Sequence, residues 1–151
     1  MGQATDVSNI PGAGRAAEVI SAAECLQLLA TEEVGRLGVI VDGRPDIFPV
    51  NYTVDGDGIL FRTADGSKLE GALHGPVVFE VDQLSRESRT GWSVVVHGTA
   101  ATYTRFDTPD RRETRQPWLD TIKPHLIRLA PTRITGRRIQ ISRASDDPAS
   151  G

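Results

Sequence analysis

The sequence predicts a mainly β domain, a β-rich α+β fold in which an antiparallel barrel carries a few short helices. Two observations support this prediction: about seven apolar, β-branched runs, and tight Asp-Gly turns at Asp42–Gly43 and Asp55–Gly58. Only three short segments have helical character. Because a doubly wound sheet needs a helix between most consecutive strands, that class is excluded.

Composition places the chain among single-domain proteins that fold without disulfides. It has 151 residues, with 17 Lys plus Arg against 20 Asp plus Glu, a net charge of −3. This balance does not favour nucleic-acid binding, and the chain has no apolar run long enough to span a membrane. The N-terminus lacks a signal-peptide pattern, and the single cysteine, Cys25, cannot form an internal disulfide. We therefore expect a cytoplasmic protein.

Both ends of the chain are rich in small and polar residues and have little to bury. We expect residues 1–17 to form a flexible arm and residues 144–151 a flexible tail. No internal repeat and no second composition block interrupts the rest. The sequence therefore predicts one folded domain over residues 18–143.

The first predicted element of the domain is a helix that begins at Ser21. Ser21 and Glu24 have the spacing of a capping box, in which the hydroxyl accepts from the Glu24 amide and the carboxylate reaches back to the cap. Cys25, Leu28 and Leu29 follow at helical spacing and predict a short apolar stripe.

The remaining elements are mostly strands, identified by β-branched runs and by the turns between them. The predicted strands are Leu37–Val41, Ile47–Val54, Ile59–Thr63, Val77–Asp82, Trp92–Tyr103, Leu126–Leu129 and Ile134–Ser142. A loop over Ala64–Ser67 leads to a short helix from about Lys68 to Leu73, and residues 107–123 are expected to be helical in part.

Nucleophilic and metal chemistry find little support in the sequence. The three histidines, His74, His97 and His125, lie far apart and in no Ser/His/Asp or Cys/His arrangement. The chain also lacks Cys-x-x-Cys and His-x-x-x-His spacings, so no metal site is predicted.

One segment gathers groups that could hold a phosphate. In Phe61–Lys68 a strand ends in Arg62 and Thr63, a glycine turn follows, and Ser67 and Lys68 begin a helix. Guanidinium, hydroxyl, ammonium and free helix amides are the donors that phosphate requires. The alternative is an ordinary connection between a strand and a helix, with solvated Arg and Lys.

Two further segments could contact a planar ligand. Trp92 and Ser93 lie at the start of a long strand, where the indole could form the wall of a ring site or close the barrel core. Pro49 lies inside a predicted strand, a position tolerated only at an edge or a bulge. The backbone there could meet a ligand, or the segment could be a simple edge strand.

Taken together, these segments resemble the pyridoxamine 5′-phosphate oxidase-related flavoproteins, which have an FMN-binding split β-barrel. The resemblance covers about residues 20–142, and the branch it resembles includes small oxidase-like and nitroimidazole-resistance proteins. It is carried by Phe48–Tyr52, Asp55–Gly58, Phe61–Thr63, Gly66–Lys68, Val78–Asp82, Thr90–Thr99 and Ile134–Arg138.

The resemblance implies an FMN cofactor and a homodimer with two flavin sites at the subunit interface. The strand that matches Pro49, Val50, Asn51 and Tyr52 would offer backbone hydrogen bonds to the isoalloxazine. Arg62, Thr63, Ser67 and Lys68 match the positions that hold the phosphate. Trp92 and Ser93 match a segment that approaches the ring from the other subunit, and Arg137 or Arg138 could add positive charge.

The implied function is an FMN-binding oxidoreductase that passes hydride or electrons to an unknown small molecule. The chain lacks the C-terminal Arg and His segment of the true oxidases, so pyridoxamine phosphate oxidation is not expected. Three alternatives stay open: a split-barrel protein that binds a deazaflavin or haem, a non-catalytic flavin-binding or sensing module, and a structural dimer without cofactor.

Overall fold

The computed structural model describes residues 18–64, 66, 71–103 and 125–140. Its elements are β1 (Glu18–Ile20), α1 (Ala22–Leu29), β2 (Val34–Val41), β3 (Arg44–Asp55), β4 (Gly58–Thr63), β5 (Pro76–Ser85), β6 (Thr90–Thr102) and β7 (His125–Gln140). Gly71–Leu73, the described end of the predicted second helix, is helical. The predicted arm, the tail and the helical segment 107–123 lie outside the described residues.

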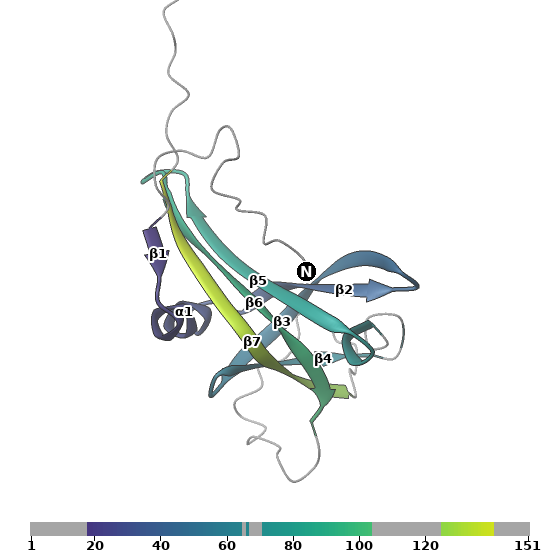
Figure 1. Ribbon diagram of the computed structural model, residues 1–151. Helices are drawn as coiled ribbons and strands as arrows, with labels where there is room; N and C mark the ends of the chain where they lie inside the picture. The colour runs from purple at the N-terminus through teal and green to yellow at the C-terminus, as the bar shows by residue number, and fades with distance from the viewer. Residues whose placement is uncertain (1–17, 65, 67–70, 104–124, 141–151) are drawn as a thin grey trace, which may run out of the picture.

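The strands form one antiparallel sheet that closes into a barrel (Figure 1). Their order is β1-β7-β4-β3-β2-β5-β6, and β6 pairs again with β7. Because β5 pairs with β2 only over Arg36–Gly38 and Val78–Glu80, the closure on that side is short. The mainly β split-barrel prediction is confirmed.

β7 corrects the prediction of two strands near the C-terminus, because Leu126–Leu129 and Ile134–Ser142 belong to one continuous strand up to Gln140. A bulge shifts the register between His97 and Gly98 of β6 and accommodates Pro131 of β7. At this bulge a Cβ on Gly98 would collide with the Ala130 carbonyl, so glycine lets the two backbones approach. The strand therefore passes through a segment that looks like a break in the sequence.

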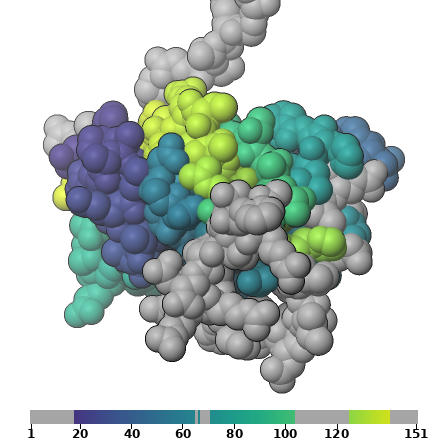
Figure 2. Space-filling model, turned by 90° about the horizontal axis from the view of Figure 1, so that it is seen from below, coloured from purple at the N-terminus to yellow at the C-terminus, as the bar shows by residue number. Residues whose placement is uncertain are grey.

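Helix α1 covers one end of the barrel, as its apolar stripe predicts. Ser21 is the N-cap and accepts a hydrogen bond from the Glu24 amide at 3.3 Å. The Glu24 carboxylate, however, pairs with Arg138 of β7, so the return half of the predicted capping box is replaced by a tertiary contact. Figure 2 shows the purple surface of β1 and α1 beside the yellow-green surface of β7. Within α1, the side chains of Cys25 and Leu29 are fully buried against the barrel.

Tyr52 links this helix to the core. Its ring packs edge-on against Phe79, with the ring centroids 4.9 Å apart, and its hydroxyl donates to the Leu29 carbonyl. Burial raises the pKa of Tyr52, and the Glu32 carboxylate adds to the effect, so the phenol stays protonated.

We expect Tyr52→Phe to lower the free energy of unfolding by about 1 kcal/mol, because one buried hydrogen bond is lost while the ring packing is kept. Urea denaturation measures this change. Flavin affinity should be unchanged, since the side chain points into the core; a large loss of affinity would show that Tyr52 also supports the ligand site.

Candidate functional site

The predicted edge at Pro49 is present in β3. This strand pairs with β2 over Arg44–Asn51, whereas β4 pairs with it only over Tyr52–Asp55. Residues 44–51 thus extend beyond the end of the β4 ladder. Pro49 lies in this segment, where a missing N–H breaks no ladder bond to β4.

The hydrogen-bond alternation shows which backbone groups turn away from β2. The Tyr52 amide donates to the Glu33 carbonyl at 3.0 Å. In an antiparallel ladder the direction alternates, so Val50 also faces β2, while Asn51 and Pro49 direct their backbone groups to the opposite side. This side can offer the amide and carbonyl of Asn51 and the carbonyl of Pro49 to a planar heterocycle.

The side chains of this segment divide between two surfaces. Val50 and Tyr52 are buried in the core, so only their backbone is available to a ligand. Pro49 is exposed and Asn51 is half-buried on the outer face of the barrel.

Arg62 and Thr63 end β4, the next strand to β3. They pair with Leu126 and His125 at the beginning of β7. Thr63 is buried, and its hydroxyl donates to the Ala64 carbonyl at 3.2 Å. Gly66 has a φ of 133°, a conformation that favours glycine, which is consistent with the predicted turn. Ser67 and Lys68, the other two predicted phosphate ligands, lie outside the described residues.

Trp92 and Ser93 lie far from these groups along the sheet. They pair with Arg138 and Arg137 near the end of β7. Between Leu126 and Arg138 the strand advances 12 residues, roughly 40 Å of contour length at 3.3 Å per residue. In Figure 1, β7 crosses the whole domain as a gently curved strand, from β4 at one end to β1 at the other. The predicted ring contacts Trp92 and Ser93 therefore lie at the opposite end of the subunit from the predicted phosphate contacts Arg62 and Thr63.

Trp92 and Ser93 also face opposite sides of β6. Trp92 is 8% exposed and belongs to the core cluster, whereas Ser93 is half-buried on the outer face. Of the two roles open for the indole, this geometry favours the core. A ligand on the outer face would meet the side chain of Ser93 and the backbone of Trp92.

The outer face near Ser93 carries a network of charges. The Arg36 guanidinium contacts Glu80 at 3.3 Å and Asp82 at 3.2 Å. Asp82 stands opposite Ser93 in the β5–β6 ladder, and Ser93 stands opposite Arg137 in the β6–β7 ladder. The row thus presents both signs of charge around one hydroxyl.

Glu80 is expected to make stability depend on pH. Burial and the neighbouring Asp82 raise the pKa of Glu80, although Arg36 opposes the shift. The folded state then holds the proton more tightly than the unfolded state, so this contribution to stability is lost as the pH rises through the raised pKa. As the pH rises from about 4 to about 7, we expect the melting temperature of Glu80→Gln to increase relative to that of the unsubstituted protein. The exposed Glu87→Gln serves as control, and a constant difference across this range would contradict the assignment.

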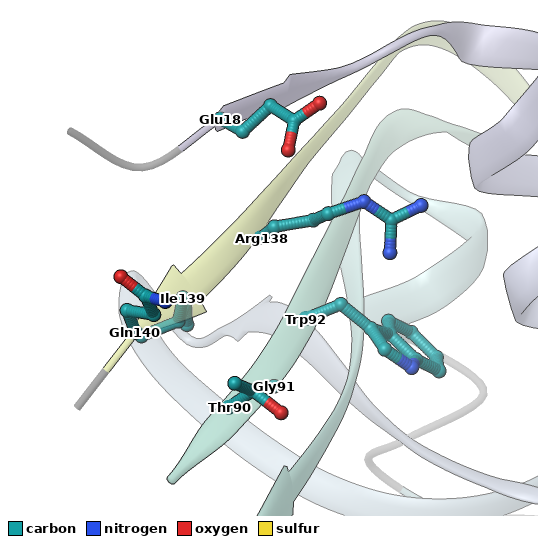
Figure 3. A pocket seen from close by; sticks show the side chains of 7 residues that line it. All are labelled: Glu18, Thr90, Gly91, Trp92, Arg138, Ile139 and Gln140. Atoms are coloured by element: carbon teal, nitrogen blue, oxygen red, sulfur yellow. The ribbon is translucent and has the colours of Figure 1, made fainter. Parts of the chain in front are cut away.

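A pocket of about 390 Å³ opens at the end of the β6–β7 ribbon (Figure 3). Trp92 and Arg138 line it together with residues that the sequence analysis did not single out: Glu18, Thr90 and Gln140. Nothing in the sequence pattern predicts this group, because Glu18 and Arg138 become neighbours only through the β1–β7 ladder.

Two negative findings apply to the described part of the chain. It has no group of three His, Cys, Asp or Glu side chains placed to hold a metal ion. Among its helices, none is both long and apolar enough to cross a membrane.

Comparison with known proteins identifies the family. The model of the pyridoxamine 5′-phosphate oxidase family matches residues 21–138, which is most of the chain. The chain belongs to this family. An uncharacterized protein of Mycobacterium tuberculosis is 32% identical over 126 residues, covering 77% of this chain and 81% of that protein.

Solved structures with the same fold include proteins named for different cofactors. The FAD-binding protein of Mycobacterium smegmatis has a TM-score of 0.64 and 36% identity, covering 83% of this chain and all of that one. A haem-binding protein of the same species has a TM-score of 0.62 at 20% identity, covering 76% of this chain and 53% of that one, a likeness that shows the fold alone. These likenesses support the split-barrel fold for this member of the pyridoxamine 5′-phosphate oxidase family.

Proposed function

We propose that this protein is a flavin-dependent oxidoreductase that binds FMN at two equivalent sites between the subunits of a homodimer. The observation that carries the proposal is the separation of its contacts. Pro49–Tyr52 and Arg62–Thr63 lie on neighbouring strands, whereas Trp92 and Ser93 lie at the other end of β7. A second subunit can bring its own Ser93 to the first subunit's β3 edge.

The donor groups of this chain fit a flavin nucleotide. Arg62, Thr63, Ser67 and Lys68 would hold the phosphate through charge-assisted hydrogen bonds, and Asn51 would bind the edge of the ring through its backbone. Trp92 would support this arrangement from behind the strand. We assign no ligand role to Arg137 or Arg138 in this site.

When bound, flavin supplies the electron-transfer chemistry, and the protein supplies orientation, electrostatics and exclusion of water. We assign no general acid or base in this site, and we infer that its residues act by binding and positioning the flavin. Protonation at the site would then depend on solvent or on the substrate.

A second candidate cofactor is FAD. The specific observation in its favour is the M. smegmatis FAD-binding protein, which is 36% identical to this chain. Equilibrium titrations with FMN, FAD and riboflavin separate the two: tighter binding of FAD than of FMN would replace FMN in the proposal.

An exposed apolar surface supports the homodimer. Val34, Ile40 and Ile47 point outward from β2 and β3 with 44%, 48% and 64% of their surface exposed. The carboxylates of Glu80 and Asp82, beside this surface, can pair with Arg137 of a second copy. Sedimentation should give a dimer, and a stable monomer that still binds flavin tightly would contradict it.

Catalysis is tested with the purified protein. We expect a yellow protein whose flavin bands bleach on addition of NADH or NADPH and return in air. Flavin bands without any bleaching by either nucleotide would favour the non-catalytic flavin-binding module, and a haem spectrum would overturn the flavin assignment. The lone cysteine is consistent with action in the cytoplasm.

A further inference from the structure

The pocket at the end of the β6–β7 ribbon is distinct from the proposed flavin site. Thr90 stands opposite Gln140, and Trp92 stands opposite Arg138, which also stands opposite Glu18 of β1. Opposite residues, and residues two apart on one strand, share a face of the sheet, so all five side chains belong to the same face. Ser93, the proposed flavin contact, is on the other face.

The charges in this pocket are incompletely matched. Arg138 makes its ion pair with Glu24 of α1 rather than with Glu18, its direct neighbour across the ladder. Among the described residues Glu18 makes no ion pair and no hydrogen bond through its carboxylate. Figure 3 shows the side chains of Glu18, Arg138 and Trp92 extending in the same direction, with Arg138 between the other two. Glu18 is thus available to a cation that enters the pocket.

The pocket also has more donors than the described chain uses. The indole N–H of Trp92 has no hydrogen-bond partner within the described residues, and solvent reaches it, because none of their buried side-chain N or O atoms is left without a partner. Arg138 has five N–H donors and uses one of them on Glu24. An acceptor oxygen that enters the pocket can therefore replace water at the donors of Trp92 and Arg138.

We propose that this pocket binds a small zwitterionic molecule, an amino acid or a similar amino carboxylate. Its ammonium group pairs with Glu18, and its carboxylate accepts from Trp92 and from the free donors of Arg138. Thr90 and Gln140 provide polar contacts at the rim. The volume of about 390 Å³ lies within the range of small-molecule sites.

Isothermal titration calorimetry on the full chain tests this proposal with γ-aminobutyrate as the probe. Butyrate and n-butylamine each retain one of its two charges and serve as matched controls. We expect γ-aminobutyrate to bind at least about tenfold more tightly than either control, since a hydrogen bond to a charged group is worth about that factor. Equal affinities for the three compounds, or no binding of γ-aminobutyrate, would overturn the proposal.

Variants assign the two contacts separately. Trp92→Phe keeps an aromatic ring in the core and removes the N–H, and Glu18→Gln removes the charge at an exposed position; each should weaken γ-aminobutyrate about tenfold. Glu87→Gln, on the turn between β5 and β6, should change nothing. If Trp92→Phe does not fold, Glu18→Gln decides alone. Unchanged affinity in the folded variants would overturn the proposal. Because the titration is done without flavin, a negative result would not contradict the proposed flavin site.

Discussion

Replacing Trp92 by alanine is expected to lower the free energy of unfolding by about 3–5 kcal/mol, the usual cost of removing a large aromatic side chain from a core. Trp92 is 8% exposed and packs in the main core cluster, so its removal leaves a cavity. Chemical denaturation of the flavin-free protein measures the loss. Trp92→Phe is the matched control and should lose much less, because most of the ring volume remains.

A small loss of stability in Trp92→Ala would instead support the alternative in which the indole forms a wall of the ring site. In that case Trp92→Ala would melt almost normally and bind flavin weakly. Fluorescence gives an independent reading: in a Trp118→Phe background only Trp92 emits, and strong quenching by FMN would place the indole close to the ring. Trp118 itself lies outside the described residues.

Lys68→Ala is expected to weaken FMN binding roughly ten- to a hundredfold while leaving riboflavin binding unchanged. A charge-assisted contact to phosphate is worth about 1.5–3 kcal/mol, and riboflavin has no phosphate. Equilibrium dialysis with both ligands measures the two affinities. Arg62→Ala should show the same selectivity, whereas Arg44→Ala, an exposed position at the far end of β3, should affect neither ligand.

Equal weakening of FMN and riboflavin would contradict the phosphate assignment. It would show that Lys68 acts through the fold of its loop and not through a contact with the phosphate. The conservative variant Lys68→Arg then separates charge from shape, because it keeps the charge and should retain most of the selectivity.

Much of the barrel can be predicted because local signals determine its elements. The Asp42–Gly43 turn has positive φ at both residues, as a tight hairpin requires, and it joins β2 to β3. The alternation of Trp92, Val94 and Val96 on one face of β6 predicts the buried side of that strand. Pro49 likewise indicates an incompletely paired strand from its own chemistry.

What the sequence did not predict depends on contacts between distant segments. β7 is continuous because a bulge at Thr132 lets the strand pass Pro131 opposite Gly98, a compensation that is visible only once β6 and β7 pair. β1 has three residues, too few for a periodic pattern. The pocket around Arg138 requires Glu18, at the opposite end of the domain sequence. Tertiary pairing, rather than local propensity, creates these features.

A mixed dimer tests the central claim most directly. Arg62→Glu removes the phosphate contact from one chain, and Ser93→Trp blocks the ring contact of another; neither homodimer should bind FMN. If each site takes Arg62 from one subunit and Ser93 from the other, the mixed dimer has one site with both changes and one site with neither. We expect it to bind one FMN per dimer with normal affinity. No binding by a mixed dimer whose assembly is confirmed by sedimentation would show that each site lies within a single chain.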